Sequence, residues 1–142
     1  MRRLLAFVAG ILFAATAAAQ QFKAFGDIEV HYAVVNTLFL QPDVAARYGI
    51  VRDTDRAIVN VSVLDHDGAA LAADLSGVTV NLLNHEAKLK FDAIKEDAST
   101  YYIAPIRYTN QDVLRFRIDV ALPDRPPMRL EFQQEMYVEP EP

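Results

Sequence analysis

Residues 114–132 read LRFRIDVALPDRPPMRLEF, and this stretch decides the fold. In both halves of it an apolar residue alternates with a charged one, and the proline-rich segment 123–127 separates the halves. Alternation with a period of two places the apolar side chains on one face of a β-strand and the polar side chains on the other. The stretch therefore predicts two strands joined by a turn, each with one buried and one solvated face.

The same alternation recurs along most of the chain, whereas helical periodicity is scarce. The predicted strands are Ile28–Val35, Val59–Val63, Val78–Leu82, Lys88–Asp92, Tyr101–Tyr108, Leu114–Leu122 and Met128–Gln133. In the third of these we expect Val78, Val80 and Leu82 to face the core. The pair Gln133-Gln134 interrupts the alternation and predicts a bulge in the last strand.

Seven short strands in a chain of this length favour an all-β fold. Turn signals separate the strands, and each strand has one wet face, which is typical of antiparallel sheets. We therefore expect an immunoglobulin-like antiparallel β-sandwich of about seven strands. An up-and-down barrel is the second possibility, although it would prefer an even number of strands.

The longest irregular segment, residues 36–55, connects the first two predicted strands. Within it, Pro42 suits the first turn of a helix, Asp43 favours the helix N-terminus, and Gly49 suits the left-handed residue that ends a helix. We expect one short helix here. The connection is either a lid that closes one end of the sandwich, burying Leu38, Leu40, Val44 and Ile50, or a functional loop.

Residues 1–19 have the pattern of a cleavable secretory signal peptide. Arg2 and Arg3 precede an apolar core, and Ala17–Ala19 supply the small residues that a signal peptidase recognises. We therefore expect an exported, periplasmic protein with no stable membrane anchor after cleavage. The remaining chain divides into a single domain, residues 20–138, and an acidic disordered tail, residues 139–142.

Composition excludes several functional classes. Removal of residues 1–19 takes away two arginines and moves the net charge from −5 to about −7, which makes nucleic acid a poor partner. The chain has no cysteine, so thiol redox chemistry, thiolate metal sites and lipidation are excluded.

No catalytic or metal-binding motif is present in the sequence. The three histidines, His31, His66 and His85, are far apart and match no metal-ligand spacing. Neither a Gly-x-Ser-x-Gly elbow nor a phosphate-binding loop occurs. We therefore expect no enzyme activity, no cofactor and no metal.

The segment Gly26–Arg52 resembles a known family. The stretch GDIEVHY at 26–32, followed by Asn36-Thr37, Leu40-Gln41-Pro42 and Tyr48-Gly49-Ile50, is similar to small exported proteobacterial proteins grouped as a domain of unknown function, family 4426. This resemblance implies a periplasmic sandwich without an assigned activity, and it transfers no catalytic residue.

The polar residues of this segment form our candidate site. We expect a small polar cluster at one end of the sandwich, which either holds the long connection or forms the rim of a ligand site. Its members are Asp27, His31, Asn36, Tyr48 and Arg52.

These observations favour a non-enzymatic binding or interaction protein of the cell envelope. An edge strand or a loop would contact an envelope protein partner, because an exposed sheet edge accepts an additional strand. The alternative is a small-molecule or metal-ion binder that uses the segment 26–52.

Overall fold

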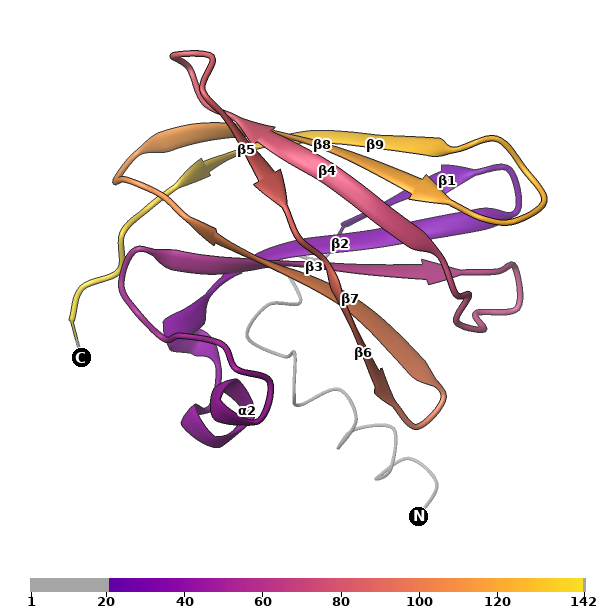
Figure 1. Cartoon of the computed structure of the whole chain (residues 1–142), viewed down its shortest axis with the longest axis horizontal. Helices are drawn as coiled ribbons and strands as arrows, with labels where there is room; N and C mark the ends of the chain where they lie inside the picture. Colours follow the sequence, from indigo (N-terminus) through magenta and orange to yellow (C-terminus); the bar gives the residue numbers. More distant parts are fainter. Residues whose placement is uncertain (1–20, 142) are drawn as a thin grey trace.

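The structure, a computed structural model, describes residues 21–141, which form two antiparallel sheets packed face to face (Figure 1). The predicted signal peptide lies outside the described residues. The five-stranded sheet contains, in spatial order, β1 (Gln21–Phe25), β2 (Ile28–Asn36), β3 (Arg56–Leu64), β7 (Ser99–Arg107) and β6 (Asp92–Glu96). The four-stranded sheet contains β5 (Glu86–Leu89), β4 (Asp74–Val80), β8 (Asp112–Ala121) and β9 (Met128–Met136). The predicted sandwich is therefore confirmed.

The core lies between the two sheets and is built from the alternating apolar residues. β-Branched residues dominate the inner face of the five-stranded sheet. Larger side chains dominate the facing side of the four-stranded sheet. The fully buried side chains include Val30, Val59, Val61, Val63, Phe116, Ile118, Val120 and Leu130. At the side of the sandwich, the ring of Tyr32 stacks on that of Phe132 with 4.2 Å between centroids, which joins the two sheets directly.

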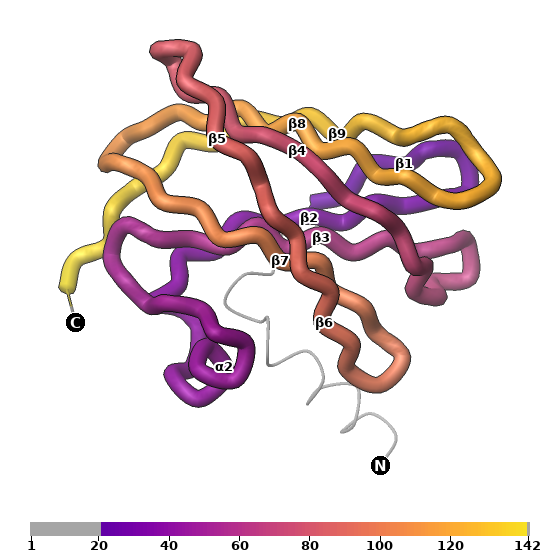
Figure 2. The backbone as a smooth tube through the Cα atoms, in the orientation of Figure 1, coloured from indigo at the N-terminus to yellow at the C-terminus, as the bar shows by residue number. Residues whose placement is uncertain are grey.

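Within residues 21–141 the chain forms nine strands, where the sequence predicts about seven. Strand β1, an edge strand with four exposed residues, is not among the predicted strands, because QFKAF alternates over too few residues to mark a buried face. The predicted strand 88–92 is in fact the end of β5 and the start of β6. Figure 2 shows the chain passing from one sheet to the other at this point. The alternation continues through the crossing because Leu89 and Phe91 both pack on the core.

The faces of β4 are the reverse of the prediction. Thr79 faces the core opposite Phe116, whereas Val80 faces outward opposite Arg115. Leu82 lies in the turn beyond the strand and is exposed. Gly77 lies on the core side opposite Ile118, where a Cβ atom would be 2.5 Å from the carbonyl oxygen of Arg117. Only glycine allows β4 to approach β8 this closely on the core side.

The predicted bulge in β9 is wrong. The pairing of β8 with β9 runs without interruption from Asp112 opposite Met136 to Val120 opposite Met128. Gln134 takes an inward position opposite Leu114 and is only partly buried near the end of the strand. A polar residue is therefore accommodated on the core face without any shift of register.

The predicted helix is confirmed as α2 (Pro42–Arg47), preceded by a 3-10 turn, η2 (Thr37–Phe39). Gly49 follows the helix with a φ of +67°, a left-handed conformation that glycine adopts without strain. The connection lies on the outer face of the five-stranded sheet, where Leu40 and Ile50 pack on Ile58. It covers the outside of that sheet at one end, rather than closing the core. The four residues that we expected a lid to bury, Leu38, Leu40, Val44 and Ile50, are only half-buried.

No helix within residues 21–141 is long and apolar enough to span a membrane.

Candidate functional site

The structure separates the five residues of the predicted cluster. Asp27 lies in the β1–β2 turn, where its carboxylate accepts a hydrogen bond of 3.3 Å from Arg125, and this contact lowers the pKa of Asp27. Asn36 is at the other end of β2, and nine residues of extended strand span about 30 Å. A single cluster that contains both residues is therefore impossible, and the expectation of one polar cluster is corrected.

His31 also lies away from the long connection. It is on the outer face of β2, where its Nε2 atom is 2.9 Å from Oε1 of Glu29. Its ring stacks on the exposed ring of Phe22 in β1, with 5.0 Å between centroids. His31 is thus held by its neighbours on β1 and β2.

Asn36 is the centre of a buried hydrogen-bond network at one end of the sandwich. Its Nδ2 group donates to the hydroxyl of Tyr108 at 2.6 Å and to the carbonyl of Thr54 at 2.9 Å. Its Oδ1 atom accepts from the backbone N–H of Leu38 at 2.8 Å. The Tyr108 hydroxyl in turn donates to the carbonyl of Tyr137 at 2.7 Å. We call these groups the Asn36 network.

The Asn36 network holds the long connection and the C-terminal segment together. Arg52 adds a hydrogen bond of 3.1 Å from its Nη2 group to the carbonyl of Leu38, and the backbone N–H of Glu139 donates to Thr54 at 3.0 Å. Ordered contacts thus reach the first residue of the predicted tail. Of the predicted cluster, only Asn36 and Arg52 come together, both through Leu38. Their contacts are those of a structural network.

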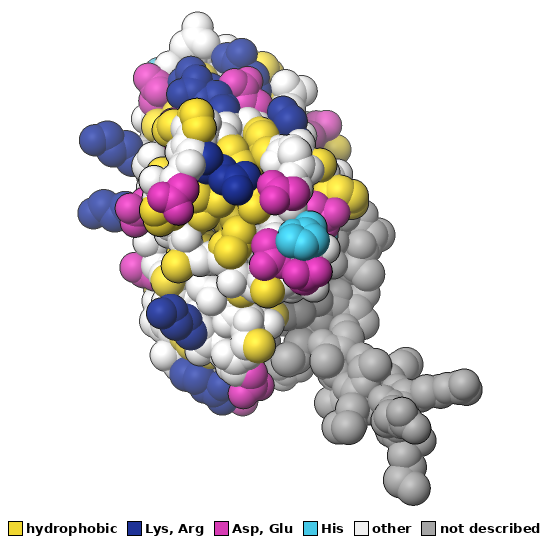
Figure 3. Space-filling view, turned by 90° about the vertical axis from the view of Figure 1, so that its right-hand side faces the viewer, with side chains coloured by type: hydrophobic (Ala, Val, Ile, Leu, Met, Phe, Trp, Pro, Cys, Tyr) yellow, Lys and Arg dark blue, Asp and Glu magenta, His cyan; other side chains and the backbone are white. Residues whose placement is uncertain are grey.

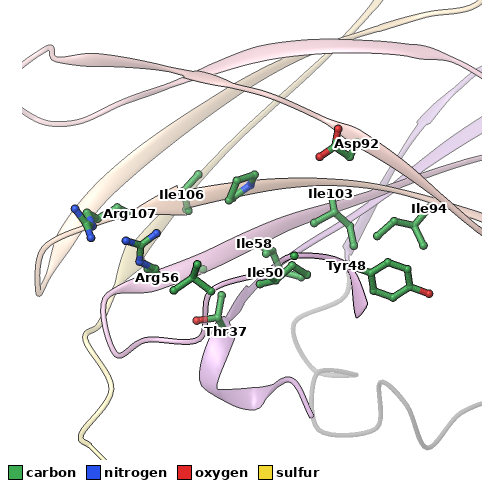
Figure 4. A pocket seen from close by; sticks show the side chains of 14 residues that line it. Thr37, Tyr48, Ile50, Arg56, Ile58, Asp92, Ile94, Ile103, Ile106 and Arg107 are labelled. Atoms are coloured by element: carbon green, nitrogen blue, oxygen red, sulfur yellow. The ribbon is translucent and has the colours of Figure 1, made fainter. Parts of the chain in front are cut away.

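A pocket of about 420 Å³ lies between the long connection and the outer face of the five-stranded sheet (Figure 4). We call it the outer pocket. Five isoleucines give it an apolar lining, and Tyr48, from the predicted cluster, stands at one side. These isoleucines are Ile50 from the connection, Ile58 from β3, Ile94 from β6, and Ile103 and Ile106 from β7.

Two arginines stand together at one end of the outer pocket. Arg56 of β3 is paired in register with Arg107 of β7, so two like charges are direct cross-strand neighbours. Such pairs are destabilising, whereas opposite charges in these positions attract. The carboxylate of Asp55 lies 3.9 Å from Nε of Arg107, too far for a hydrogen bond.

Arg56 also has a buried atom without a partner. Its Nε group is shielded from solvent and makes no hydrogen bond within residues 21–141. The only other such side-chain atom in that range, Oδ1 of Asn60, lies on the same outer face of β3. A buried, unsatisfied polar group costs about 1–3 kcal/mol, so two of them on one face need an explanation.

The outer face of the four-stranded sheet is different. There Arg129 of β9 binds Asp119 of β8 at 2.9 Å, and Arg117 of β8 binds Glu86 of β5 at 3.2 Å. Opposite charges are therefore neighbours on this sheet, as expected for a solvated surface.

The end of the sandwich opposite the Asn36 network carries mixed charges. Figure 3 views this end and shows acidic and basic side chains interspersed around a histidine. His66 lies 3.4 Å from Asp67 in the β3–β4 loop. However, no group of three or more His, Cys, Asp or Glu side chains in the described part of the chain is arranged to hold a metal ion.

Known proteins resemble this chain in sequence and in fold. The family model "Domain of unknown function (DUF4426)" matches residues 22–139. A crystal structure of a DUF4426 protein from Pseudomonas aeruginosa is 29% identical, with a TM-score of 0.80 over 87% of this chain and 99% of that chain. No curated protein matches the chain.

Two more distant structures share the fold alone. FetP of uropathogenic Escherichia coli, expressed recombinantly in the periplasm, is 10% identical, with a TM-score of 0.63 over 86% of this chain and 96% of that chain. A copper-bound variant of FetP is 8% identical, with a TM-score of 0.62 over 85% of this chain and 97% of that chain.

Proposed function

This chain belongs to the DUF4426 family, and we propose that it is an exported, non-enzymatic binding protein of the cell envelope whose ligand site is the outer pocket. The observation that carries the proposal is the unpartnered Nε group of Arg56, buried beside an apolar pocket. Ligand sites are typically apolar pockets of about 300–1,000 Å³ with a few polar groups that fix the orientation of the ligand.

The outer pocket supports binding rather than catalysis. Its polar side chains are those of Thr37, Tyr48, Arg56, Asp92 and Arg107, and no histidine or serine lines it. A nucleophile must lie within hydrogen-bond distance of the base that activates it, but the Thr37 hydroxyl is hydrogen-bonded to the backbone of Asp53 instead. Residues Tyr48–Ile50 come from the segment 26–52 that the sequence indicates as a ligand site.

An envelope location agrees with the signal-peptide pattern of residues 1–19 and with the periplasmic expression of FetP. The copper of the FetP variant is compatible with a binding role for this fold. We do not extend the metal itself to this chain, because the described residues offer no suitable group of ligands.

Ligand retention tests the proposal. The full-length protein, expressed with its own N-terminal segment, is purified from the periplasm and compared by native and denaturing mass spectrometry. We expect a small molecule that is released on denaturation. The variant Ile94→Trp should lose this molecule, because an indole at this pocket-lining position fills the space.

A matched control places the same indole on the other sheet. Ser76 is exposed on the outer face of β4, so Ser76→Trp should retain the ligand. If wild-type protein carries no small molecule, and extracts of the envelope leave the amide resonances around the pocket unchanged, the proposed ligand site is wrong.

A second candidate function is the binding of an envelope protein through β1. Among residues 21–141 this edge strand is paired on one side only, and Phe22 on it is 57% exposed. An added strand would pair with the free backbone groups of β1. A photoreactive residue at Phe22 should then crosslink in cells to one defined protein, whereas the same residue at Ser76 should not. The absence of a specific product at Phe22 would contradict this candidate.

A further inference from the structure

The charges around the outer pocket are unbalanced at one end. Arg56 and Arg107 face each other across β3 and β7, and Asp55 approaches only Arg107, at 3.9 Å. The other acidic group of the pocket, Asp92, stands near Ile103, away from the two arginines (Figure 4). Two cations therefore meet at this end without a hydrogen-bonded counter-charge.

The guanidinium of Arg56 is suited to bind an anion. It presents several N–H donors in one plane, a geometry that matches the two oxygens of a carboxylate. Its Nε–H group is already shielded from water and has no acceptor among the described residues. An oxyanion placed between Arg56 and Arg107 would reduce the repulsion between the two side chains, and a small shift of the Arg56 side chain would let the anion accept from the Nε–H group as well.

The remainder of the pocket is suited to an aliphatic group. Ile50, Ile58 and Ile103 extend from the arginine end toward Ile94 and Tyr48. A volume of about 420 Å³ is at the lower end of the usual range for small-molecule sites. This size suits a medium-length chain rather than a large lipid.

From this arrangement we propose that the outer pocket binds an aliphatic carboxylate, with the carboxylate between Arg56 and Arg107 and the aliphatic chain on the isoleucines. The inference rests on the proposed function, because it names the ligand class of the same site. Arg56 is the main anion receptor, since it is partly buried and its charge is therefore less screened by solvent. The side chain of Arg107 is 66% exposed, so its contribution is more strongly screened.

Three probes separate the head of the ligand from its chain. Decanoate has both parts, decanol has the chain alone and acetate has the head alone. Each probe is titrated into the protein below its micellar concentration, with amide chemical shifts as the readout. A charge-assisted hydrogen bond contributes about 1.5–3 kcal/mol, so decanoate should bind at least about tenfold more tightly than decanol or acetate.

Arginine variants test where the head binds. In Arg56→Gln the preference for decanoate over decanol should fall to about twofold or less, since the charge is lost, while decanol still binds. Arg107→Gln should reduce the preference by a smaller factor. Arg115→Gln, on the outer face of the four-stranded sheet, is the matched control and should keep the full preference.

The outcomes distinguish this inference from the proposed function. Equal binding of decanol and decanoate to the wild-type pocket, or an unchanged preference in Arg56→Gln, would overturn the carboxylate class and leave the pocket as a ligand site. Failure of all three probes, while a different molecule is retained from the periplasm, would also overturn only the ligand class. Failure of the probes together with no retained molecule would overturn both.

Discussion

At one end of the sandwich, the inner and outer sides of the five-stranded sheet differ in how completely their polar side chains are hydrogen-bonded. Asn36 ends β2 and is paired in register with Ala57, the residue that follows Arg56 in β3. On the inner side, every polar group of the Asn36 side chain has a hydrogen-bond partner. On the outer side, Arg56 faces another arginine, and its Nε group has no partner among residues 21–141.

This difference distinguishes the polar residues that maintain the structure from those that are available to a ligand. A satisfied buried network stabilises the segments that it joins, whereas unsatisfied groups and like charges lower stability unless something binds them. The outer face of the four-stranded sheet shows that this chain does pair opposite charges where a surface is simply solvated, as Arg129 and Asp119 do. At Arg56, whose Nε group has no partner among residues 21–141, the outer face of the five-stranded sheet departs from this pattern, which supports the proposed ligand site.

The largest expected effect comes from removing the centre of the inner network. Asn36→Ala deletes three hydrogen bonds and leaves the carbonyl of Thr54 and the N–H of Leu38 with fewer partners. We expect the free energy of unfolding to fall by about 2 kcal/mol, because buried groups lose their acceptors and donors. Urea denaturation at neutral pH measures this change.

The control for this prediction is Asn110→Ala. Asn110 accepts one exposed hydrogen bond, from the backbone N–H of Val138. Its removal should lower the free energy of unfolding by less than about 1 kcal/mol. Equal effects of the two substitutions would show that the inner network has no special role in holding the connection.

A change of opposite sign is expected on the outer side. Arg56→Met removes one of two facing positive charges and the buried unpartnered Nε group, while the methionine covers the isoleucines. We expect the ligand-free protein to gain about 1 kcal/mol in the free energy of unfolding. Arg129→Met, which breaks the ion pair with Asp119, should instead lose about 0.2–1 kcal/mol.

This pair of variants tests the comparison of the two sheets. If Arg56→Met lowers the free energy of unfolding as Arg129→Met does, Arg56 stabilises the free protein, and the outer face is not strained in the absence of ligand.

Much of the fold is predictable from the sequence because alternation has a direct structural meaning. The strands around Phe116 and Leu130, the helix at Pro42 and the left-handed Gly49 all follow from local patterns. The edge strand β1 is short and exposed, so the partial alternation of QFKAF does not mark a buried face. The faces of β4 follow from its register with β8, where Thr79 lies opposite Phe116, and no local pattern determines that register.

The candidate site was less predictable for a physical reason. The sequence identifies Asn36 and Arg52 as parts of a polar network, but it does not reveal the partners of Asn36, Thr54 and Tyr108, or the Leu38 carbonyl that Arg52 contacts. The pairing of Arg56 with Arg107 depends on the register between β3 and β7, which no local pattern determines. Residues that act through cross-strand neighbours therefore become visible only in the folded sheet.

The smallest expected effect concerns the pH dependence of the two sides. Burial raises the pKa of Tyr108 above its usual value of 10.0, although the hydrogen bond from Asn36 opposes this shift. As pH rises above about 10, the unfolded chain loses the tyrosine proton before the folded protein does, so the stability that the neutral hydroxyl provides is lost progressively up to the raised folded pKa. The variant Tyr108→Phe lacks this proton. At pH 7 its free energy of unfolding should be about 1 kcal/mol below that of the wild type, because the hydrogen bond to Tyr137 is lost. This difference should shrink between pH 10 and 11, because only the wild type loses stability by this route. Urea denaturation of both proteins at several pH values measures the difference.

The stability change caused by Arg56→Met should stay constant over the same range, because arginine remains protonated. A Tyr108 deficit that does not change with pH would show that this hydroxyl is not shielded as the inner network requires.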